Sequence, residues 1–330
     1  MQRVTSSMLA SISISLVACQ SPSSRLEALT SDFTWTQAAD CPQPRFEAMG
    51  LAVNGQLLVM GGFVSESLAV TSRVDVFDPD SNVWSQRQDL PGAETHAAAV
   101  VKDGTVYVVG GFRGPFQTWA TSSEFWAYDF ANDVWNALPS LPAPRAALSL
   151  TNVRNTFFAI GGLAADGDSD SPENTYWSID DEQWTAAPDL PNPRNHLGGA
   201  AVQGQVYIVG GRHSWDETGG NQSALHQFDP KSSGWTTLTD IPQARAEIAA
   251  STFSTGDRLV VIGGSVKGAR PSSDVWVYDP GTDRWAALPP LPDPRKGAVA
   301  DVIGNRIVVT TGSPTGTDPA GTTWIGCCLD

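Results

Sequence analysis

The chain has 330 residues, of which 41% are apolar, and its formal net charge at pH 7 is −15. A chain of this length and composition can bury a large core in one or two domains. The acidic balance argues against a nucleic-acid partner, whose phosphates require a basic surface, and against electrostatic adhesion to anionic lipid. Charged residues make up 17% of the chain beside 31 Gly and 23 Pro, a mixture typical of short strands joined by many turns.

The N-terminal segment has the pattern of an export signal. Arg3 precedes the apolar and small-residue stretch 8–18, which is too short to span a bilayer. The stretch ends in Leu16-Val17-Ala18-Cys19, which resembles the lipobox of bacterial lipoproteins. The resemblance implies that residues 1–18 are a signal peptide, that Cys19 is lipidated, and that residues 19–32 tether an exported protein to a membrane. The expected location is the outer-membrane or periplasmic face, or the cell surface. The alternative is an ordinary secretory signal, cleaved after Ala18 without lipidation.

Copies of one sequence pattern follow, from about residue 33 to residue 328. Each copy combines a Gly-Gly pair, a Leu-Pro and Pro-Arg segment and a Trp, and the tryptophans recur at intervals of roughly 50 residues. The Gly-Gly pairs begin at Gly61, Gly110, Gly161, Gly210 and Gly263, with Thr311-Gly312 as a degenerate sixth, and the tryptophans are Trp35, Trp84, Trp135, Trp184, Trp235 and Trp285. Self-similarity at this period predicts a repeat architecture.

Each copy is predicted to contain four strands, a to d. Strand a follows the Arg position and is rich in small residues, as in Ala97-Ala98-Ala99, and strand b is an apolar run into the Gly-Gly pair. Strand c is short and ends in Asp, and strand d carries the Trp after a turn such as Asp279-Pro280-Gly281-Thr282. These sizes predict a radial arrangement, because strands that converge on an axis have room only for Ala and Gly, while Trp fills the widening space at the rim.

The Gly-Gly pair, the aromatic residue in strand c and the Trp in strand d resemble the kelch repeat family. The resemblance implies an all-β fold, a six-bladed β-propeller with four-stranded blades over residues 33–330. Trp35 lies in a strand-d context, Phe33-Thr34-Trp35-Thr36, without strands a to c before it, and the last copy lacks its own strand d. We therefore expect the N-terminal strand to complete the last blade and close the ring without a free edge.

Five arginines occupy one position of the repeat and are expected at one mouth of the central channel: Arg45, Arg145, Arg194, Arg245 and Arg295. One interpretation is a cationic cup for a carboxylate, because the Arg fork binds carboxylates through two hydrogen bonds. The other is that a feature present in five blades serves the scaffold, by pairing with backbone carbonyls or a neighbouring acid. Glu94 replaces the Arg in the second blade and joins the set of candidate ligand-binding residues.

Residues that break the sixfold pattern are better evidence for a site. Two residues after the Arg position lie Glu47, His96, His196 and Glu247, which we take as weak catalytic candidates because acids and bases at a channel mouth can transfer protons. A polar channel lining without chemistry is the alternative. The loops between strands b and c add four candidate ligand-binding residues, Arg212, His213, Trp119 and Trp215. The two tryptophans suit stacking on a sugar ring, or packing under their own loops.

The predicted function is an exported, lipid-anchored binding module for an anionic glycan or an acidic protein segment on the Arg-lined face. The alternative is a carbohydrate-active enzyme of the mutarotase or epimerase type, resembling the periplasmic sialic acid mutarotase. A deep pocket in which His96 and His196 converge favours the enzyme, and an open dish favours the binding module. No cofactor and no metal are expected, because no residues have a spacing such as C-x-x-C and no Cys lies near a Tyr/His cluster that could hold copper.

Overall fold

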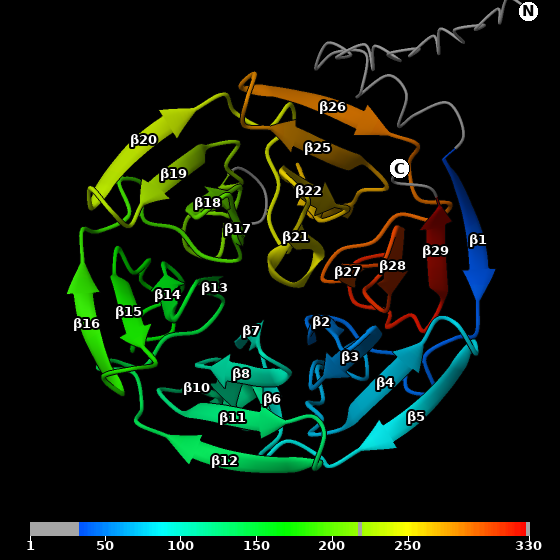
Figure 1. Cartoon of the computed structure of the whole chain (residues 1–330). Coiled ribbons are helices and arrows are strands. Elements are labelled where there is room, and N and C mark those ends of the chain that lie inside the picture. Colours follow the sequence, from blue (N-terminus) through cyan, green and yellow to red (C-terminus); the bar gives the residue numbers. More distant parts are fainter. Residues whose placement is uncertain (1–32, 217–219, 328–330) are drawn as a thin grey trace, which may run out of the picture.

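The computed structural model describes residues 33–216 and 220–327 of the chain, and the predicted signal peptide, Cys19 and tether lie outside these residues. Within the described ranges, six four-stranded antiparallel sheets form blades around a central axis (Figure 1). The predicted all-β propeller is therefore confirmed. Among the described residues, none of the helices has the length and apolar character needed to cross a membrane.

The blades follow one another along the chain, and the strands of each blade are named in order from the axial strand a to the outer strand d. The first two blades contain β2 (Met49–Val53), β3 (Gln56–Met60), β4 (Val74–Asp78), β5 (Val83–Arg87), then β7 (Ala98–Lys102), β8 (Thr105–Val109), β11 (Phe125–Asp129) and β12 (Val134–Leu138). The third and fourth contain β13 (Ser149–Val153), β14 (Thr156–Ile160), β15 (Asn174–Ser178), β16 (Gln183–Ala187), then β17 (Gly198–Val202), β18 (Gln205–Val209), β19 (Leu225–Asp229) and β20 (Gly234–Leu238). The fifth and sixth contain β21 (Thr252–Thr255), β22 (Arg258–Ile262), β25 (Val275–Asp279), β26 (Arg284–Leu288), then β27 (Val299–Ile303), β28 (Arg306–Thr310), β29 (Thr323–Cys327) and β1 (Thr34–Ala38).

The sixth blade is built from both ends of the described chain. Strand β1 pairs with β29 in an antiparallel register that runs from Thr34 opposite Cys327 to Ala38 opposite Thr323. Phe33, just before β1, is buried and packs edge-on against Trp35 with ring centroids 5.1 Å apart. These contacts close the ring through the N-terminal strand, as expected. Strand β1 covers the edge of β29, which would otherwise expose unpaired backbone groups.

The Gly-Gly pairs join each blade to the next through the backbone. The second glycine of each pair donates its N–H to the carbonyl of the Arg position in the following blade, for example Gly162 to Arg194 at 2.9 Å. The last blade closes the ring in the same way, because Gly312 donates to Arg45 at 2.8 Å. Gly162 has a φ of 98° and a Cβ there would meet the Ala146 carbonyl, so this position requires glycine.

The six repeat tryptophans form a second set of links at the rim. Each indole N–H donates to a backbone carbonyl just after the outer strand of the preceding blade: Trp35 to Pro289, Trp84 to Ala39, Trp135 to Gln88, Trp184 to Pro139, Trp235 to Pro188 and Trp285 to Thr239, at 2.8–3.1 Å. Space filling and one hydrogen bond therefore both explain why Trp recurs on strand d.

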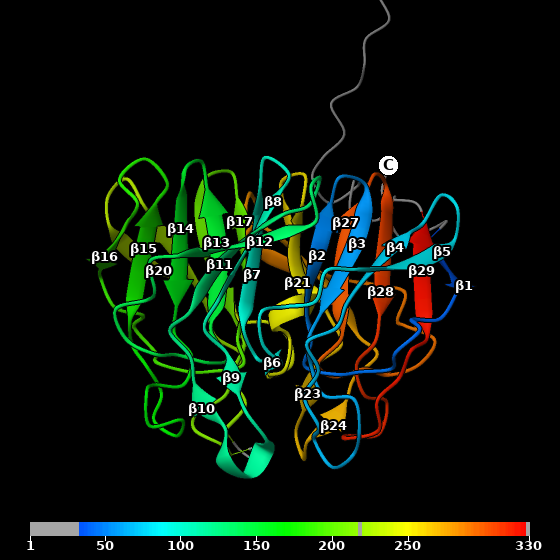
Figure 2. The ribbon, with the colours of Figure 1, turned by 90° about the horizontal axis from the view of Figure 1, so that it is seen from below.

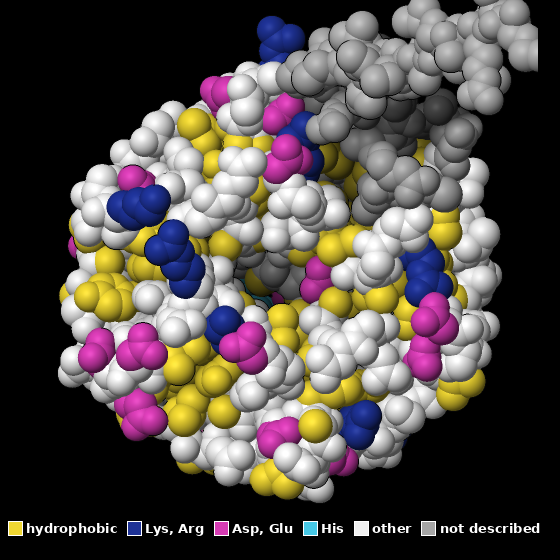
Figure 3. Space-filling model, viewed as in Figure 1, with side chains coloured by type: hydrophobic (Ala, Val, Ile, Leu, Met, Phe, Trp, Pro, Cys, Tyr) yellow, Lys and Arg dark blue, Asp and Glu magenta, His cyan; other side chains and the backbone are white. Residues whose placement is uncertain are grey.

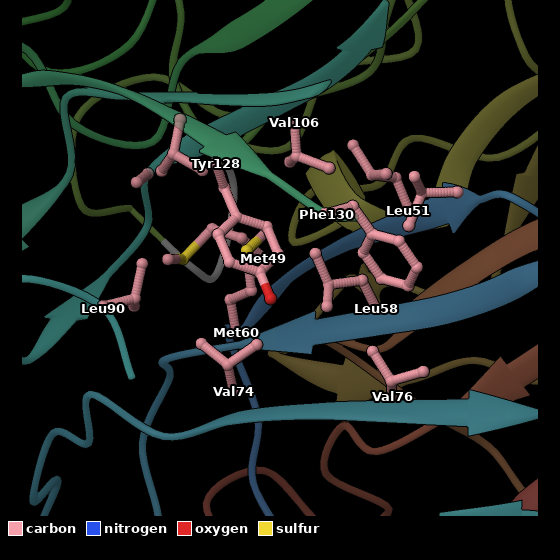
Figure 4. Close-up of a cluster of buried hydrophobic side chains, with 13 residues drawn as sticks. Met49, Leu51, Leu58, Met60, Val74, Val76, Leu90, Val106, Tyr128 and Phe130 are labelled. Atoms are coloured by element: carbon pink, nitrogen blue, oxygen red, sulfur yellow. The ribbon is translucent and has the colours of Figure 1, made fainter. Parts of the chain in front are cut away.

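Apolar clusters fill the space between neighbouring blades. Figure 4 shows the cluster between the first and second blades, where Met49, Leu58 and Met60 meet Tyr128 and Phe130. Nearer the axis the strands are too close for larger side chains, and a Cβ added at Gly199 would collide with the Ser149 hydroxyl of the neighbouring blade. The predicted gradient from small axial residues to Trp at the rim is confirmed.

The two faces of the ring differ in the length of their connections (Figure 2). One face, which we call the turn face, carries two-residue a–b turns such as Asn54-Gly55 and the short c–d turns. The other, the loop face, carries the d–a and b–c connections, which include the short strands β6 (Glu94–Thr95), β9 (Phe112–Arg113), β10 (Ala120–Thr121), β23 (Ser265–Val266) and β24 (Arg270–Pro271) and the 3-10 turns η1 (Phe116–Thr118) and η2 (Ala249–Ser251).

Candidate functional site

Six residues close the axis near the loop face, and we call them the axial ring: Glu47, His96, Ala147, His196, Glu247 and Gly297. All six have left-handed backbone conformations, with φ between 51° and 58°. Five N–H groups of the ring region donate around it at 2.8–3.1 Å, as in His196 to Ala147 and Glu247 to His196. The sixth link is made by the Thr95 hydroxyl, which donates to the Glu47 carbonyl at 2.9 Å.

Four side chains of the axial ring converge, and we call them the axial cluster: Glu47, His96, His196 and Glu247. The two imidazole rings lie edge to face with centroids 4.9 Å apart. Nε2 of His96 is 3.6 Å from Oε2 of Glu47, and Nε2 of His196 is 3.8 Å from Oε2 of Glu247. The side chains of His196 and Glu247 are almost fully buried, at 1% and 2% exposure.

Hydrogen bonds fix the tautomer of both histidines. Nδ1 of His196 faces the amide oxygen of Asn195, which can only accept, so this nitrogen carries the proton. Nδ1 of His96 is 3.0 Å from the Thr95 hydroxyl, which already donates to a carbonyl and so accepts from the imidazole. Both Nε2 atoms therefore present a lone pair toward the carboxyl groups.

Arg212 is the cation nearest to the axial cluster. Its Nη1 lies 2.7 Å from Oε1 of Glu247, its Nη2 is 3.1 Å from Nε2 of His196, and the guanidinium lies 5.3 Å above the Trp215 ring. Burial, and the nearby Glu247 carboxylate, raise the pKa of Glu47 well above its usual range. Burial would also raise the pKa of Glu247, but the charge of Arg212 opposes it and the pKa is held well below its usual value.

Burial lowers the pKa of His96 to about 4 and, together with the Arg212 charge, holds the pKa of His196 well below its usual value. At neutral pH both imidazoles are therefore uncharged. The two carboxyl groups have pKa values displaced in opposite directions, an arrangement that can supply one proton donor and one proton acceptor.

Aromatic side chains close the loop face over the axial cluster. Trp119 stacks on Phe112 with centroids 4.1 Å apart, and Trp215 lies 5.9 Å from Trp119. Trp119 also meets His96 at 5.9 Å, and Trp215 meets His196 at 5.4 Å. The tryptophans that the sequence offered as ligand-stacking residues thus pack on each other and on the histidines, which agrees with the packing alternative.

A cavity of about 300 Å³ runs along the axis with the axial cluster at one end. Its wall is formed by the axial strands, and the face turned toward the viewer in Figure 3, which carries the turns, is hollowed at the axis. The charged residues that line it are all acidic, namely Glu47, Glu247 and Asp301. Asp301 was not among the residues predicted from the sequence. The feature that could have indicated it is a single acidic residue in the axial strand that contains Val299-Ala300-Asp301. Burial raises the pKa of Asp301 to about 6.

The five repeat arginines do not line this cavity. Their residues are 0–2% exposed, and their guanidinium groups bond to neighbouring carbonyls and acids. Arg194 donates to the carbonyls of Asn192 and Ile208 at 2.8 and 3.2 Å, and Arg45 pairs with the buried Asp75. The expected cationic cup is therefore wrong, because these side chains form internal hydrogen bonds and ion pairs, as the alternative interpretation stated. The charged residues that line the axial cavity are acidic instead.

The other two predicted ligand-binding residues also have internal partners. Glu94 is 1% exposed and accepts a hydrogen bond of 3.2 Å from Arg113 on the neighbouring strand, while burial raises its pKa to about 7. His213 is exposed on the loop face and its Nε2 lies 2.8 Å from Oδ1 of Asn192. The structure therefore brings Glu47, His96, His196, Glu247 and Arg212 together and leaves Glu94 and His213 apart from them.

Comparison with known proteins agrees with the repeat and with the blade geometry. The family model described as the KLHDC2/KLHL20/DRC7 Kelch-repeats domain matches residues 25–162 and 166–312. The chain belongs to the kelch-repeat family. Kelch-repeat domains act as protein-interaction modules, and this chain carries such a domain.

Curated kelch proteins match parts or most of the chain. Kelch-like protein terF of Aspergillus terreus is 30% identical over 277 residues, covering 82% of this chain and 50% of that protein. Human Kelch-like protein 34 is 26% identical over 191 residues, covering 58% of this chain and 23% of that protein. The human Rab9 effector protein with kelch motifs is 31% identical over 100 residues, covering 28% and 27%. The matches span half or less of the relatives' own length.

The scaffold role of the repeat arginines leads to a stability prediction. Arg194→Ala should lower the free energy of unfolding by about 3 kcal/mol, because it removes charge-assisted hydrogen bonds and leaves buried carbonyls without a donor. Urea denaturation of the purified protein measures this. Arg284→Ala, at an exposed position on the outer strand β26, should change it by less than about 0.5 kcal/mol. Equal stabilities for Arg194→Ala and the native protein would contradict the scaffold role.

Proposed function

We propose that this kelch-repeat chain binds a partner protein through its loop face, with the b–c loop of the second blade as the central contact. The observation that carries the proposal is Phe116, a large apolar side chain that is 42% exposed on the η1 turn. This turn projects beyond the rest of the loop face (Figure 2). A relative named as a Rab9 effector supports a protein as the kind of partner.

The surroundings of Phe116 resemble those of an interface anchor. Its ring meets Trp119 edge-on at 4.8 Å, and Trp119 rests on the buried Phe112, so the exposed ring stands on a rigid aromatic base. Nearby Arg113 is held by Glu94 and Glu124, and supplies a polar rim. Pre-organised aromatic groups with an Arg beside them contribute a large share of the binding energy in protein interfaces, because little side-chain freedom is lost on binding.

The chemistry of the partner differs from the one expected from the sequence. The five repeat arginines are bonded internally, so they give no support to an anionic glycan or acidic segment. An exposed Phe on an aromatic base favours an apolar or aromatic side chain of the partner.

A photo-crosslinking amino acid at position 116 tests this function in cells that produce the protein. It should give a discrete adduct with one partner, whereas the same amino acid at Val134, which is 47% exposed on β12, should not. With that partner purified, Phe116→Ala should weaken binding by about 30-fold, the loss typical of an interface hot spot, and Val134→Ala should leave it unchanged. Equal adducts at both positions, or equal affinities of both variants, would exclude the loop-face contact.

We further propose that the protein is exported and anchored through a lipid on Cys19. The support is the sequence Leu16-Val17-Ala18-Cys19. Two acyl chains give stable membrane residence where one chain is marginal. Cys19→Ser should therefore move the protein from the detergent phase to the aqueous phase, and mass spectrometry of the native N-terminus should show acylated Cys19. An unmodified mature N-terminus at another residue would rule the anchor out.

A second candidate function is proton-transfer catalysis on a small sugar in the axial cavity. His96 and His196 converge at the inner end of the axial cavity, and Glu47 and Glu247 beside them have pKa values displaced in opposite directions. These features support the alternative of a mutarotase-type enzyme.

Anomer interconversion of glucose and of N-acetylneuraminic acid, followed by polarimetry, tests the second candidate. Glu47→Gln should lower an enzyme-dependent rate by about 100-fold, the usual share of a general acid, while the exposed Glu182→Gln should not change it. A native protein that leaves the spontaneous rates of both sugars unchanged removes this candidate for these sugars.

A further inference from the structure

We propose that the axial cluster binds a first-row divalent metal ion of the zinc type, through Nε2 of His96, Nε2 of His196 and the carboxylate of Glu247. Two imidazoles with carboxylate oxygens are a donor set that zinc takes readily in proteins. Sequence analysis predicted no metal, because these residues come from three different blades and share no local spacing. The site goes beyond partner binding at the loop face and does not depend on it.

The distances among the donor atoms suit a metal ion better than direct hydrogen bonds. The ligand atoms of His96, His196 and Glu247 all lie within 4.8 Å of one another. The two His–Glu pairs are 3.6 and 3.8 Å apart, which is too long for a hydrogen bond. Ligand atoms about 2.0–2.1 Å from a tetrahedral zinc are separated by roughly 3.4 Å, so small side-chain adjustments complete the coordination.

The tautomers match those of metal-binding histidines. Both Nδ1 atoms donate to oxygens of the neighbouring residue, Thr95 or Asn195. Such a bond orients the ring and leaves Nε2 unprotonated for a metal, an arrangement found around most histidine ligands. Nε2 of His96 is therefore ready to coordinate, and Nε2 of His196 can coordinate once the metal replaces its hydrogen bond from Arg212.

One acceptor of the cluster has no partner. Oε2 of Glu247 is buried and has no hydrogen-bond partner among the described residues, while Nε2 of His196 accepts a hydrogen bond from Arg212. A buried carboxylate oxygen without a partner carries a desolvation cost that a nearby cation would offset. A divalent ion at this point would satisfy Glu247 and both imidazoles together.

The backbone of the axial ring supports a role for these particular side chains. A left-handed conformation favours glycine, which occupies the equivalent position 297, and it is strained for most other residues. Glu or His stands at four of the six ring positions in spite of that cost. Strain of this kind that persists in a rigid scaffold is typical of functional sites.

Arg212 and Lys296 oppose the binding of a cation. Arg212 contacts both His196 and Glu247, and Lys296 is buried beside the ring. Coordination by His196 requires its bond to Arg212 to break, while Arg212 remains on Oε1 of Glu247 and orients that carboxylate. The ion would arrive through the axial cavity, which reaches the cluster and has only acidic charged residues in its wall.

Metal titration of the full-length protein, after dialysis against a chelator, tests the proposal. We expect one Zn²⁺ bound per chain by calorimetry, a rise in melting temperature with Zn²⁺, and a visible absorption band when Co²⁺ replaces it. His96→Ala and His196→Ala should each weaken Zn²⁺ binding by about 100-fold or more, since the loss of outer-shell partners alone costs 10–100-fold. Alanine is compatible with the ring, because Ala147 occupies an equivalent position with a φ of 52°.

The control is His213→Ala, which removes an exposed imidazole from the loop face and should leave Zn²⁺ affinity unchanged. Glu247→Gln provides an isosteric variant whose fold can be checked by circular dichroism, and it should also lose the Co²⁺ band. Absence of Zn²⁺ binding by the folded native protein would overturn the proposal. Unchanged affinity in folded His96→Ala and His196→Ala would overturn it as well, because the metal would then lie elsewhere.

Discussion

The structure depends on the hydrogen bonds that join one blade to the next around the axis. The second glycine of each Gly-Gly pair donates to the carbonyl of the Arg position in the following blade, and the axial ring adds a second closed set of backbone bonds. These bonds set how closely the blades approach, so the axial strands have room only for small residues and the rim needs Trp. The arginines support the same region, because their guanidinium groups bond to carbonyls at or near the Gly-Gly pair of their own blade, such as those of Ile208 and Gly263.

Closure of the ring also determines where binding can occur. The axial ring and the aromatic stack of Phe112, Trp119 and Trp215 close the loop-face end of the axis, so the cavity opens through the turn face. The proposed partner protein would meet the loop face, where long connections and Phe116 are exposed. A small ligand or ion would reach the axial cluster from the opposite side. The fold thus separates an exposed loop surface from a buried polar site.

The axial cluster shows how burial changes the character of ordinary side chains. In water Glu47 and Glu247 would both ionise and His96 and His196 would titrate near neutral pH. At the axis, burial and Arg212 displace the pKa values of the two carboxyl groups in opposite directions and keep both imidazoles neutral. The result is a compact group of nitrogen and oxygen lone pairs, which is the chemistry on which proton transfer and metal coordination both rest.

The sequence by itself determined the six repeats, the four strands in each, the gradient from small residues to Trp and the pairing of the N-terminal strand with the last blade, because each of these leaves a periodic mark along the chain. It also placed Glu47, His96, His196 and Glu247 at equivalent positions. Only the tertiary structure decided which side chains face the axis and which are buried between strands. The direction of Arg194 depends on carbonyls of other strands and loops of its own blade. The packing of Trp119 on Trp215 and the convergence of two His and two Glu depend on contacts between different blades. No local pattern in the sequence encodes such contacts.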